Sequence, residues 1–433
     1  MTAILGILLA LAAQDVALTG ARIYTLEGDP IDRGTIVLRE GKVLSVGADV
    51  EIPDGAEIID IGGHVVIPGL VDSGSFLLQE PGDRGTAGEV NLRVVDSLDR
   101  FSTRAAEPLA AGVTTTLLLP DTAGPARGIA AVVKLPASVL RPEAGLLLSL
   151  AAGSPDAVSA MDAFNQYKAL HGRLDGAKKY IEAWEKYEKD VAEFETKKKE
   201  HEEAKAKAEE AKKDPKAPKV ETPKEPAEPK KPGRDPKNEA LARLFVDGKK
   251  VGGAGEKLPL MIEAYTLDEI RHAIKLAADF ELPFTLIGGA EAHREAEALK
   301  KTPVVYGPTV LYGSPRARFF GHTSETPARL AKAGVRVSVA SLPLVEAGYP
   351  RRSDHDASRF LMLAAAQSVA GGLDRKSALR ALTIDAAETL GVKERVGSLF
   401  PGKDADLVVL TGEPFDIDTR VSMVFVDGKR VAP

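Results

Sequence analysis

The chain has 433 residues, a formal net charge of −6 and no cysteine, with 44% hydrophobic and 5% aromatic residues. This length exceeds one small domain and suffices for a barrel of roughly 250 residues plus an accessory domain. The acidic balance provides no basic face for nucleic acid, so that class of partner is excluded. Without cysteine the chain forms no disulfide, no thiolate zinc site and no cysteine nucleophile.

The first stretch of the chain is apolar and uncharged. Residues 4–13, ILGILLALAA, have the length of a signal-peptide core, and Ala10 and Ala12 have the spacing of a cleavage site. No Lys or Arg precedes this run, so a buried first strand or helix is the alternative. The run is too short to span a bilayer, and no other stretch reaches transmembrane length. We therefore predict a signal peptide over residues 1–13 and an extracytoplasmic protein, periplasmic or secreted.

Short strands and tight turns occupy both ends of the chain. Near the start, Glu40-Gly41 separates two β-branched runs as a hairpin turn. The same pattern returns near the end, where Asp427-Gly428 is the turn. We expect residues 14–67 and 396–433 to form one small β-sandwich domain built from both chain ends.

Between the two ends, apolar strands alternate with amphipathic helices. Residues 112–120 are typical of a buried strand, and Thr266 with Glu269 forms a capping box at the start of a helix. Several further apolar runs of strand length follow. This alternation predicts an α/β fold with a closed (β/α)8 TIM-like barrel over residues 68–162 and 241–395, with a doubly wound sheet as the alternative.

Residues 163–240 interrupt the alternation. A seam at spacings of three and four predicts a helix that docks on a partner helix or on the body of the protein: Tyr180, Trp184, Tyr187, Val191 and Phe194. Beyond it, prolines among Lys and Glu predict an extended, mobile strap: Pro215, Pro218, Pro223, Pro226, Pro229, Pro232 and Pro236. Acidic and basic residues nearly balance, which favours a solvated arm over a basic binding tail. The seam is expected to fold back on its return segment or on the barrel, with self-association as the alternative.

Four stretches resemble a known family. They are GGHVVIPGLVD (62–72), AAGVTTTLLLP (110–120), LAKAGVRVSVAS (330–341) and, above all, residues 378–410. Together they resemble the metal-dependent amidohydrolase superfamily, in its imidazolonepropionase-like branch, over nearly all of the chain outside the arm. The resemblance implies a barrel, hydrolysis of C–N bonds, and one or two divalent metals at the C-terminal mouth of the barrel.

The resemblance also implies where the metal ligands stand. Similar enzymes use His-x-His after the first strand, a histidine after each of two later strands, and an aspartate after the last. The matching positions hold Gly74, Phe76, Tyr265, Gly288 and Leu342. Gly, Phe and Leu have no lone pair for a metal, and tyrosine is a poor ligand at neutral pH. We therefore expect no cofactor and a packed mouth, with Phe76 buried and contributing about 1.5 to 3 kcal/mol.

Four residues remain as catalytic candidates: Glu263, Tyr265, Lys134 and Asp72. Glu263 precedes Tyr265 by two residues and so faces the same way along a strand. In similar enzymes a lysine after an early strand bridges two metals as a carbamate. For Lys134, an ion pair with a carboxylate is the preferred interpretation. His322 and the run Asp354, His355 and Asp356 are interpreted as polar loop residues rather than as a new metal site.

Two functional hypotheses follow. The first is an exported binding or partner protein that has kept the amidohydrolase fold, is catalytically inactive or strongly impaired, and pairs with an active paralogue or with itself. The second is a hydrolase that acts on amide, cyclic amide or peptide-like bonds through an atypical site, with zinc or another divalent metal only in that case.

Overall fold

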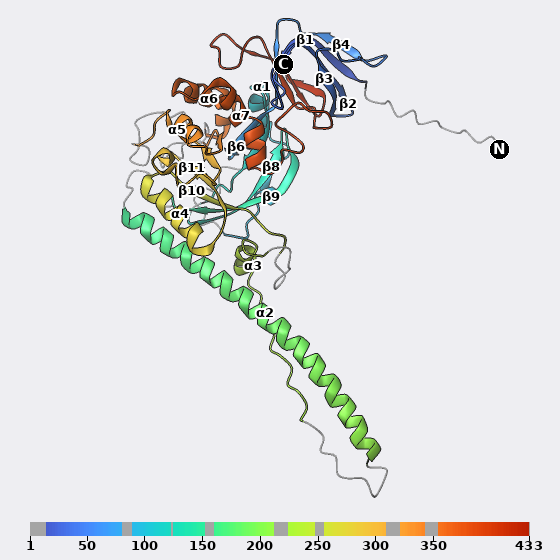
Figure 1. Cartoon of the computed structure of the whole chain (residues 1–433), viewed down its shortest axis with the longest axis vertical. Coiled ribbons are helices and arrows are strands. Elements are labelled where there is room, and N and C mark those ends of the chain that lie inside the picture. Colours follow the sequence, from blue (N-terminus) through green and yellow to red (C-terminus); the bar gives the residue numbers. More distant parts are fainter. Residues whose placement is uncertain are drawn as a thin grey trace, which may run out of the picture. The chain divides into compact units, whose positions relative to one another are not determined.

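A computed structural model describes residues 14–79, 89–122, 124–151, 160–211, 224–246, 255–308, 321–342 and 354–432 (Figure 1). The chain divides into two compact units, one made of residues 1–168 and 259–433 and the other of residues 169–258. The predicted signal peptide, residues 1–13, lies outside the described residues. No helix in the described ranges is long and apolar enough to cross a membrane.

Both ends of the chain fold into one eight-stranded sheet, the composite sheet. Its members are β1 (Val16–Ile23), β2 (Ile31–Arg39), β3 (Lys42–Gly47), β4 (Glu57–Asp60), β5 (Val65–Pro68), β14 (Leu407–Leu410), β15 (Val421–Val426) and β16 (Lys429–Ala432). The strand order is β16-β15-β14-β5-β1-β2-β3, and β4 pairs with β1. Figure 1 shows the blue N-terminal strands beside the red C-terminal ones. The predicted joining of the two chain ends is confirmed.

The two hairpin turns of this sheet lie where the sequence predicts them. Glu40 and Gly41 have φ values of 49° and 80°, and Asp427 and Gly428 have φ values of 46° and 70°. Two successive residues in this left-handed region match the twist of the flanking strands, which is why such turns favour Gly and Asp.

A second eight-stranded sheet forms the barrel. Its strands, in spatial order, are β6 (Leu70–Ser75), β7 (Val113–Leu118), β8 (Ala126–Lys134), β9 (Ser138–Ser149), β10 (Leu260–Ala264), β11 (Phe284–Gly288), β12 (Val304–Tyr306) and β13 (Val337–Val339). The sheet nearly closes because Leu342 N, just after β13, donates to the carbonyl of Gly74 on β6 at 3.1 Å. The predicted barrel is confirmed.

The regular strand–helix alternation predicted for this barrel is wrong at β8. This strand runs antiparallel to both β7 and β9. Only residues 119–125 join it to β7, and a turn at Leu135-Pro136 joins it to β9. A parallel crossover needs a dozen or more residues, so the short links enforce the reversal. The first residues of β8 therefore lie beside the end of β9, where Ala126 pairs with Leu148.

Helices connect the strands of the barrel and cover its outer face. They are α1 (Ala106–Ala110), α4 (Leu267–Phe280), α5 (Thr326–Lys332), α6 (Leu361–Ala370), α7 (Arg375–Ala381) and α8 (Ile384–Thr389). The predicted capping box of α4 is confirmed, because Thr266 and Glu269 exchange side-chain and backbone hydrogen bonds. That box begins the helix immediately after β10 and so holds the strand end in place.

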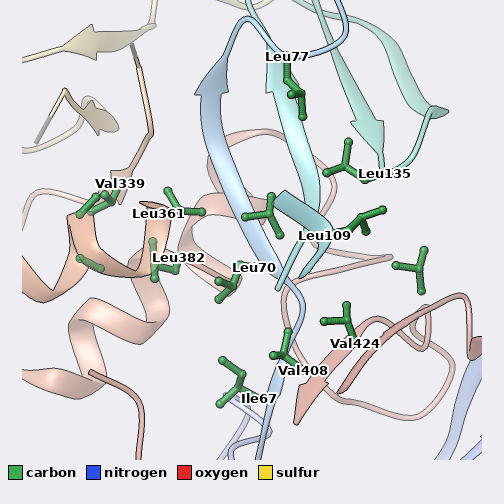
Figure 2. Packing of buried hydrophobic residues seen from close by; sticks show 14 of the residues in the cluster. Ile67, Leu70, Leu77, Leu109, Leu135, Val339, Leu361, Leu382, Val408 and Val424 are labelled. Atoms are coloured by element: carbon green, nitrogen blue, oxygen red, sulfur yellow. The ribbon is translucent and has the colours of Figure 1, made fainter. Parts of the chain in front are cut away.

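Two apolar clusters hold these layers together. One fills the barrel with a residue from each of β6 to β12: Val71, Leu117, Val132, Leu147, Met261, Ile287 and Val305. The other joins the barrel to its outer helices and to the composite sheet (Figure 2). In it, Leu70 of β6 lies between Leu361 of α6 on one side and Val408 of β14 on the other. The composite sheet and the barrel therefore share this second cluster.

The Pro68-Gly69 junction carries the chain from the composite sheet into the barrel. A Cβ atom on residue 69 would lie 2.2 Å from Thr114 Oγ1 on β7, so only glycine allows this approach. Gly69 N also donates to the carbonyl of Asp406, at 2.9 Å. The junction is thereby fastened to both sheets.

The second unit contains most of α2 (Ala160–Ala211) and α3 (Pro236–Ala242). Tyr180 and Trp184 of the predicted seam are buried against Ala242 and Val246, so the seam folds back on its return segment. Between the helices, Pro226, Pro229 and Pro232 are half-buried while the residues between them are exposed. A three-residue period is that of polyproline II. The extended strap thus has one proline face. Pro236 belongs to α3 rather than to the strap, since it begins that helix after the cap Asp235.

Deletion of residues 178–238, closed by a short Gly/Ser linker, is expected to leave the barrel folded. The seam residues that it removes pack within the second unit. Calorimetry should find the melting temperature of the barrel within about 3 °C of that of the intact chain, which corresponds to roughly 1 kcal/mol. Insoluble expression of the deletion variant would show that the arm belongs to the core of the barrel.

Candidate functional site

The carboxyl ends of β6, β9, β10, β11 and β13 and the first residues of β8 meet at one end of the barrel, called the mouth below. Catalytic groups of barrel proteins lie at this end. The predicted ligand positions and three of the four catalytic candidates lie here, whereas Lys134, the last residue of β8, pairs near the opposite end with Thr115 and Ser138.

Asp72 fastens the barrel seam. Its Oδ2 accepts hydrogen bonds from Ser341 Oγ at 2.6 Å and Ser358 Oγ at 2.7 Å. Its Oδ1 accepts from the backbone N–H of Ser341 at 2.9 Å and of Gly74 at 3.2 Å. Burial raises the pKa of Asp72, and the hydrogen bonds from Ser341 oppose that rise. All four donors are protein groups, so this carboxylate ties β6 to the segment after β13.

Gly74, Phe76 and Leu342 pack together above that seam. A Cβ atom on residue 74 would lie 3.1 Å from Leu342 Cδ2 and 3.3 Å from Leu119 Cδ1. Phe76 is 8% exposed and belongs to the same interior cluster as Leu342. The expected burial of Phe76 is therefore confirmed. Apolar side chains fill the space on this side of the mouth.

Tyr265 and Gly288 complement one another on the other side of the mouth. Gly288 has φ of 103°, and a Cβ atom there would lie 2.6 Å from Cε1 of the Tyr265 ring. The ring is also packed against Ala151 and Ala290. Tyr265 thus occupies the space that a side chain at position 288 would need.

Glu263 lies in a polar cluster beside Tyr265. Its Oε2 accepts from Arg127 Nη2 at 2.8 Å and from Ser149 Oγ at 2.6 Å. Its Oε1 accepts from the Tyr265 hydroxyl at 3.0 Å. Arg127 also donates to the carbonyl of Thr122. Among the residues that the structure describes, the mouth therefore contains a partly buried ion pair with hydroxyl groups on its carboxylate.

Arg127 and Ser149 were not among the residues predicted from the sequence. Arg127 is the second residue of β8. In a regular (β/α)8 barrel this strand would run parallel to its neighbours, and its first residues would lie at the far end of the barrel. The short 119–125 link was the one signal for the reversal, because it leaves no room for a crossover helix.

Lys134 takes part in an ion cluster away from the mouth. Its Nζ lies 2.6 Å from Asp404 Oδ2, 3.0 Å from Asp406 Oδ2 and 2.6 Å from Asp427 Oδ1. Burial opposes ionisation, but the three carboxylates raise the pKa of Lys134. A carbamate requires a neutral amine, which this environment disfavours. Lys134 therefore joins the barrel to the composite sheet as an ion-paired lysine.

Two carboxylates beside Lys134 differ in how far hydrogen bonds and nearby charge offset the cost of burial. Burial alone would raise the pKa of Asp404, but hydrogen bonds from Lys134, Lys42 and Arg395 lower it to about 2. Burial raises the pKa of Asp406 to about 6, and the nearby Lys134 charge only partly offsets it. Asp406 Oδ2 makes no hydrogen bond within the described ranges, although Lys134 Nζ is 3.0 Å away. Lys134 and Asp406 therefore form an ion pair by distance, but the angle between them does not meet the geometry of a hydrogen bond.

His322 lies in the segment before α5 and is held against Tyr306, the last residue of β12. Its Nε2 lies 2.9 Å from the Tyr306 hydroxyl, and the two rings stack at 5.8 Å between centroids. Burial lowers the pKa of His322. The side chains of Asp354, His355 and Asp356 lie outside the described part of the structure.

The residues at the five matched positions do not fit the divalent metal that the resemblance implies. Gly74, Phe76, Gly288 and Leu342 offer no ligand atom, and the Tyr265 hydroxyl is donated to Glu263. In the ranges that the structure describes, no three His, Asp or Glu side chains gather as a metal site.

A nearly closed barrel beside a separate sheet made from both chain ends is the architecture of the amidohydrolase class. Residues 325–431 match the Amidohydrolase family. The chain has the fold of the amidohydrolase superfamily, and its C-terminal quarter carries that family's sequence pattern.

Solved structures agree with this fold. A crystal structure of an amidohydrolase from Thermotoga maritima MSB8 superimposes with a TM-score of 0.72 at 24% identity, covering 96% of this chain and 99% of that one. Molinate hydrolase superimposes with a TM-score of 0.54 at 17% identity, covering 96% and 94%. Likeness at these identities concerns the fold alone.

Curated relatives match over shorter stretches. A dihydroorotase of Mycobacterium tuberculosis (strain ATCC 25618 / H37Rv) is 40% identical over 67 residues, which are 16% of this chain and 14% of that protein. Amidohydrolase tasK of Hapsidospora irregularis is 25% identical over 173 residues, 38% of this chain and 16% of that protein. The chain thus matches only a small part of the length of either relative.

Substitution of Asp406 by Asn is expected to change how stability depends on pH. The folded pKa of about 6 exceeds the unfolded value of about 3.9, so the native state keeps a proton that the unfolded state loses between these values. Stability of the wild type should therefore fall as pH rises from about 4 to 6, by up to about 3 kcal/mol. Urea unfolding at several pH values should show that Asp406→Asn loses this decline. If Asp406→Asn keeps the full decline, Asp406 does not have the raised pKa. Substitution of the exposed Asp418 by Asn serves as the control.

Substitution of Gly288 by Ala is expected to destabilise the fold. The added Cβ meets the Tyr265 ring and the Ala264 carbonyl in a backbone conformation that favours glycine. Overpacking together with this φ should cost about 2 to 4 kcal/mol in urea unfolding. The matched control is Gly334→Ala, which has φ of 83° but meets nothing within 4 Å, so a larger cost at 288 isolates the ring contact. Equal costs at the two sites would contradict the packing argument.

Proposed function

We propose that this chain is a non-catalytic member of the amidohydrolase fold class, a binding or partner protein rather than a hydrolase. One observation carries the proposal. The five residues that match the family's ligand positions pack against one another and their neighbours: Gly74, Phe76, Tyr265, Gly288 and Leu342. Their mutual fit supports a site adapted to packing rather than to metal coordination.

The activation of water by a metal shows how much rate a protein without the metal would lose. A catalytic metal lowers the pKa of its bound water from about 15.7 to about 7. At about 1.36 kcal/mol per unit this is roughly 12 kcal/mol of nucleophile activation. A lone general base contributes only about 10² to 10⁴ in rate. We therefore expect any remaining hydrolysis through the family's route to be very slow.

The second candidate is hydrolysis of a C–N bond through an atypical site, which the names of the matched relatives favour. Its strongest base is Glu263. That carboxylate already accepts hydrogen bonds from Arg127, Ser149 and Tyr265. This arrangement supports an ion pair that holds the mouth rather than a base that activates water.

Location and partner belong to the same proposal. The apolar run at residues 4–13 supports export to an extracytoplasmic compartment. An inactive barrel with an amidohydrolase fold suits pairing with a catalytically active paralogue. Pull-down of the tagged full-length chain from its own cell extract, followed by mass spectrometry of the partners, addresses this part.

Elemental analysis tests the first candidate against the second. The full-length protein, expressed with added zinc and purified without chelator, is expected to hold far less than one metal ion per chain and to hydrolyse no amide substrate. An active amidohydrolase purified in parallel shows that the procedure preserves bound metal. If this chain holds one metal ion per chain and hydrolyses an amide in a reaction that EDTA abolishes, the non-catalytic proposal is wrong.

A further inference from the structure

A shielded arginine donor lies at the mouth without an acceptor among the described residues. Arg127 Nε is buried and makes no hydrogen bond there. The rest of the guanidinium is engaged, since Nη1 donates to the Thr122 carbonyl and Nη2 donates to Glu263. A buried unpaired donor costs stability, and such groups in native proteins commonly mark an ordered water, an ion or a ligand.

We propose that the mouth binds a small organic monocarboxylate, with Arg127 Nε donating to one carboxylate oxygen. The inference rests on the proposed function, a binding barrel rather than a hydrolase, and names its ligand class. Guanidinium groups match the planar geometry of carboxylates, and their hydrogen bonds to anions are stronger than neutral ones. The location of Arg127 also supports this role. The reversal of β8 brings Arg127 to the end where barrel proteins bind their ligands.

The charge of the cluster selects the ligand class. Arg127 and Glu263 together are neutral, so one added anion leaves a single net negative charge, whereas a phosphate dianion leaves two. Both side chains are partly open to solvent, at 17% and 14% exposure. The Tyr265 ring, packed with Ala151 and Ala290, lies beside this cluster and forms its apolar neighbour. A monocarboxylate with a short apolar chain combines these features.

Glu263 is the internal competitor for the same guanidinium. It accepts from Arg127 Nη2 at 2.8 Å and thereby takes up part of the arginine charge. A neutral Gln at this position keeps an oxygen for Arg127 but removes the negative charge. Two substitutions at adjacent side chains should therefore shift affinity in opposite directions, which a purely structural ion pair would not produce.

Calorimetric titration of the full-length protein tests the inference. The protein is first dialysed against EDTA so that no metal contributes, and the probes are propionate, its neutral analogue propionamide, and inorganic phosphate. We expect propionate to bind at millimolar or lower concentration and propionamide not to bind. Arg127→Lys should weaken propionate binding about tenfold or more, and Glu263→Gln should strengthen it about tenfold. Arg329→Lys, in an exposed ion pair with Glu325, should change nothing.

Three results would overturn the inference. They are the absence of propionate binding in both the wild type and Glu263→Gln, affinities that neither substitution alters, and phosphate binding tighter than that of propionate. If Arg127→Lys fails to fold, the direction of the Glu263→Gln effect decides alone. A metal-free, inactive protein that binds no carboxylate contradicts this inference only, whereas stoichiometric metal with hydrolysis contradicts the proposed function.

Discussion

The closure of the barrel depends on the buried carboxylate of Asp72. A carboxylate shielded from water is tolerated only when its oxygens are hydrogen-bonded, and Asp72 finds its donors on Ser341, Ser358 and Gly74. Those bonds fasten β6 to the segment that follows β13, where the sheet has its one open seam. Leu342 is thereby held over Gly74, and the apolar filling of the mouth follows from that contact.

The reversal of β8 distributes charge between the two ends of the barrel. Its second residue, Arg127, pairs with Glu263 at the mouth, while its last residue, Lys134, is surrounded by carboxylates of the composite sheet. In a parallel strand these two cations would exchange ends. One short connection after β7 therefore decides both which cation lies at the mouth and how the two sheets are joined.

The positions that match the family's metal ligands are filled by packing. A ligand-rich site gathers polar groups that strain or destabilise the fold, and natural proteins accept this where the chemistry requires it. At the mouth of this barrel the corresponding positions hold a ring against a glycine and a leucine against a glycine. Beside them, Arg127, Glu263 and Ser149 form a hydrogen-bonded polar cluster.

The sequence by itself determined the features that depend on local bonds and dihedral preferences. The turns at Glu40-Gly41 and Asp427-Gly428 and the capping box before α4 are each specified within a few residues. The family pattern added the barrel and the composite sheet. Only the tertiary structure decided the fit of Tyr265 to Gly288 and the donors of Asp72. Those contacts join segments far apart in the chain, 269 residues for Asp72 and Ser341, and no local preference encodes which distant side chain will fill a given space.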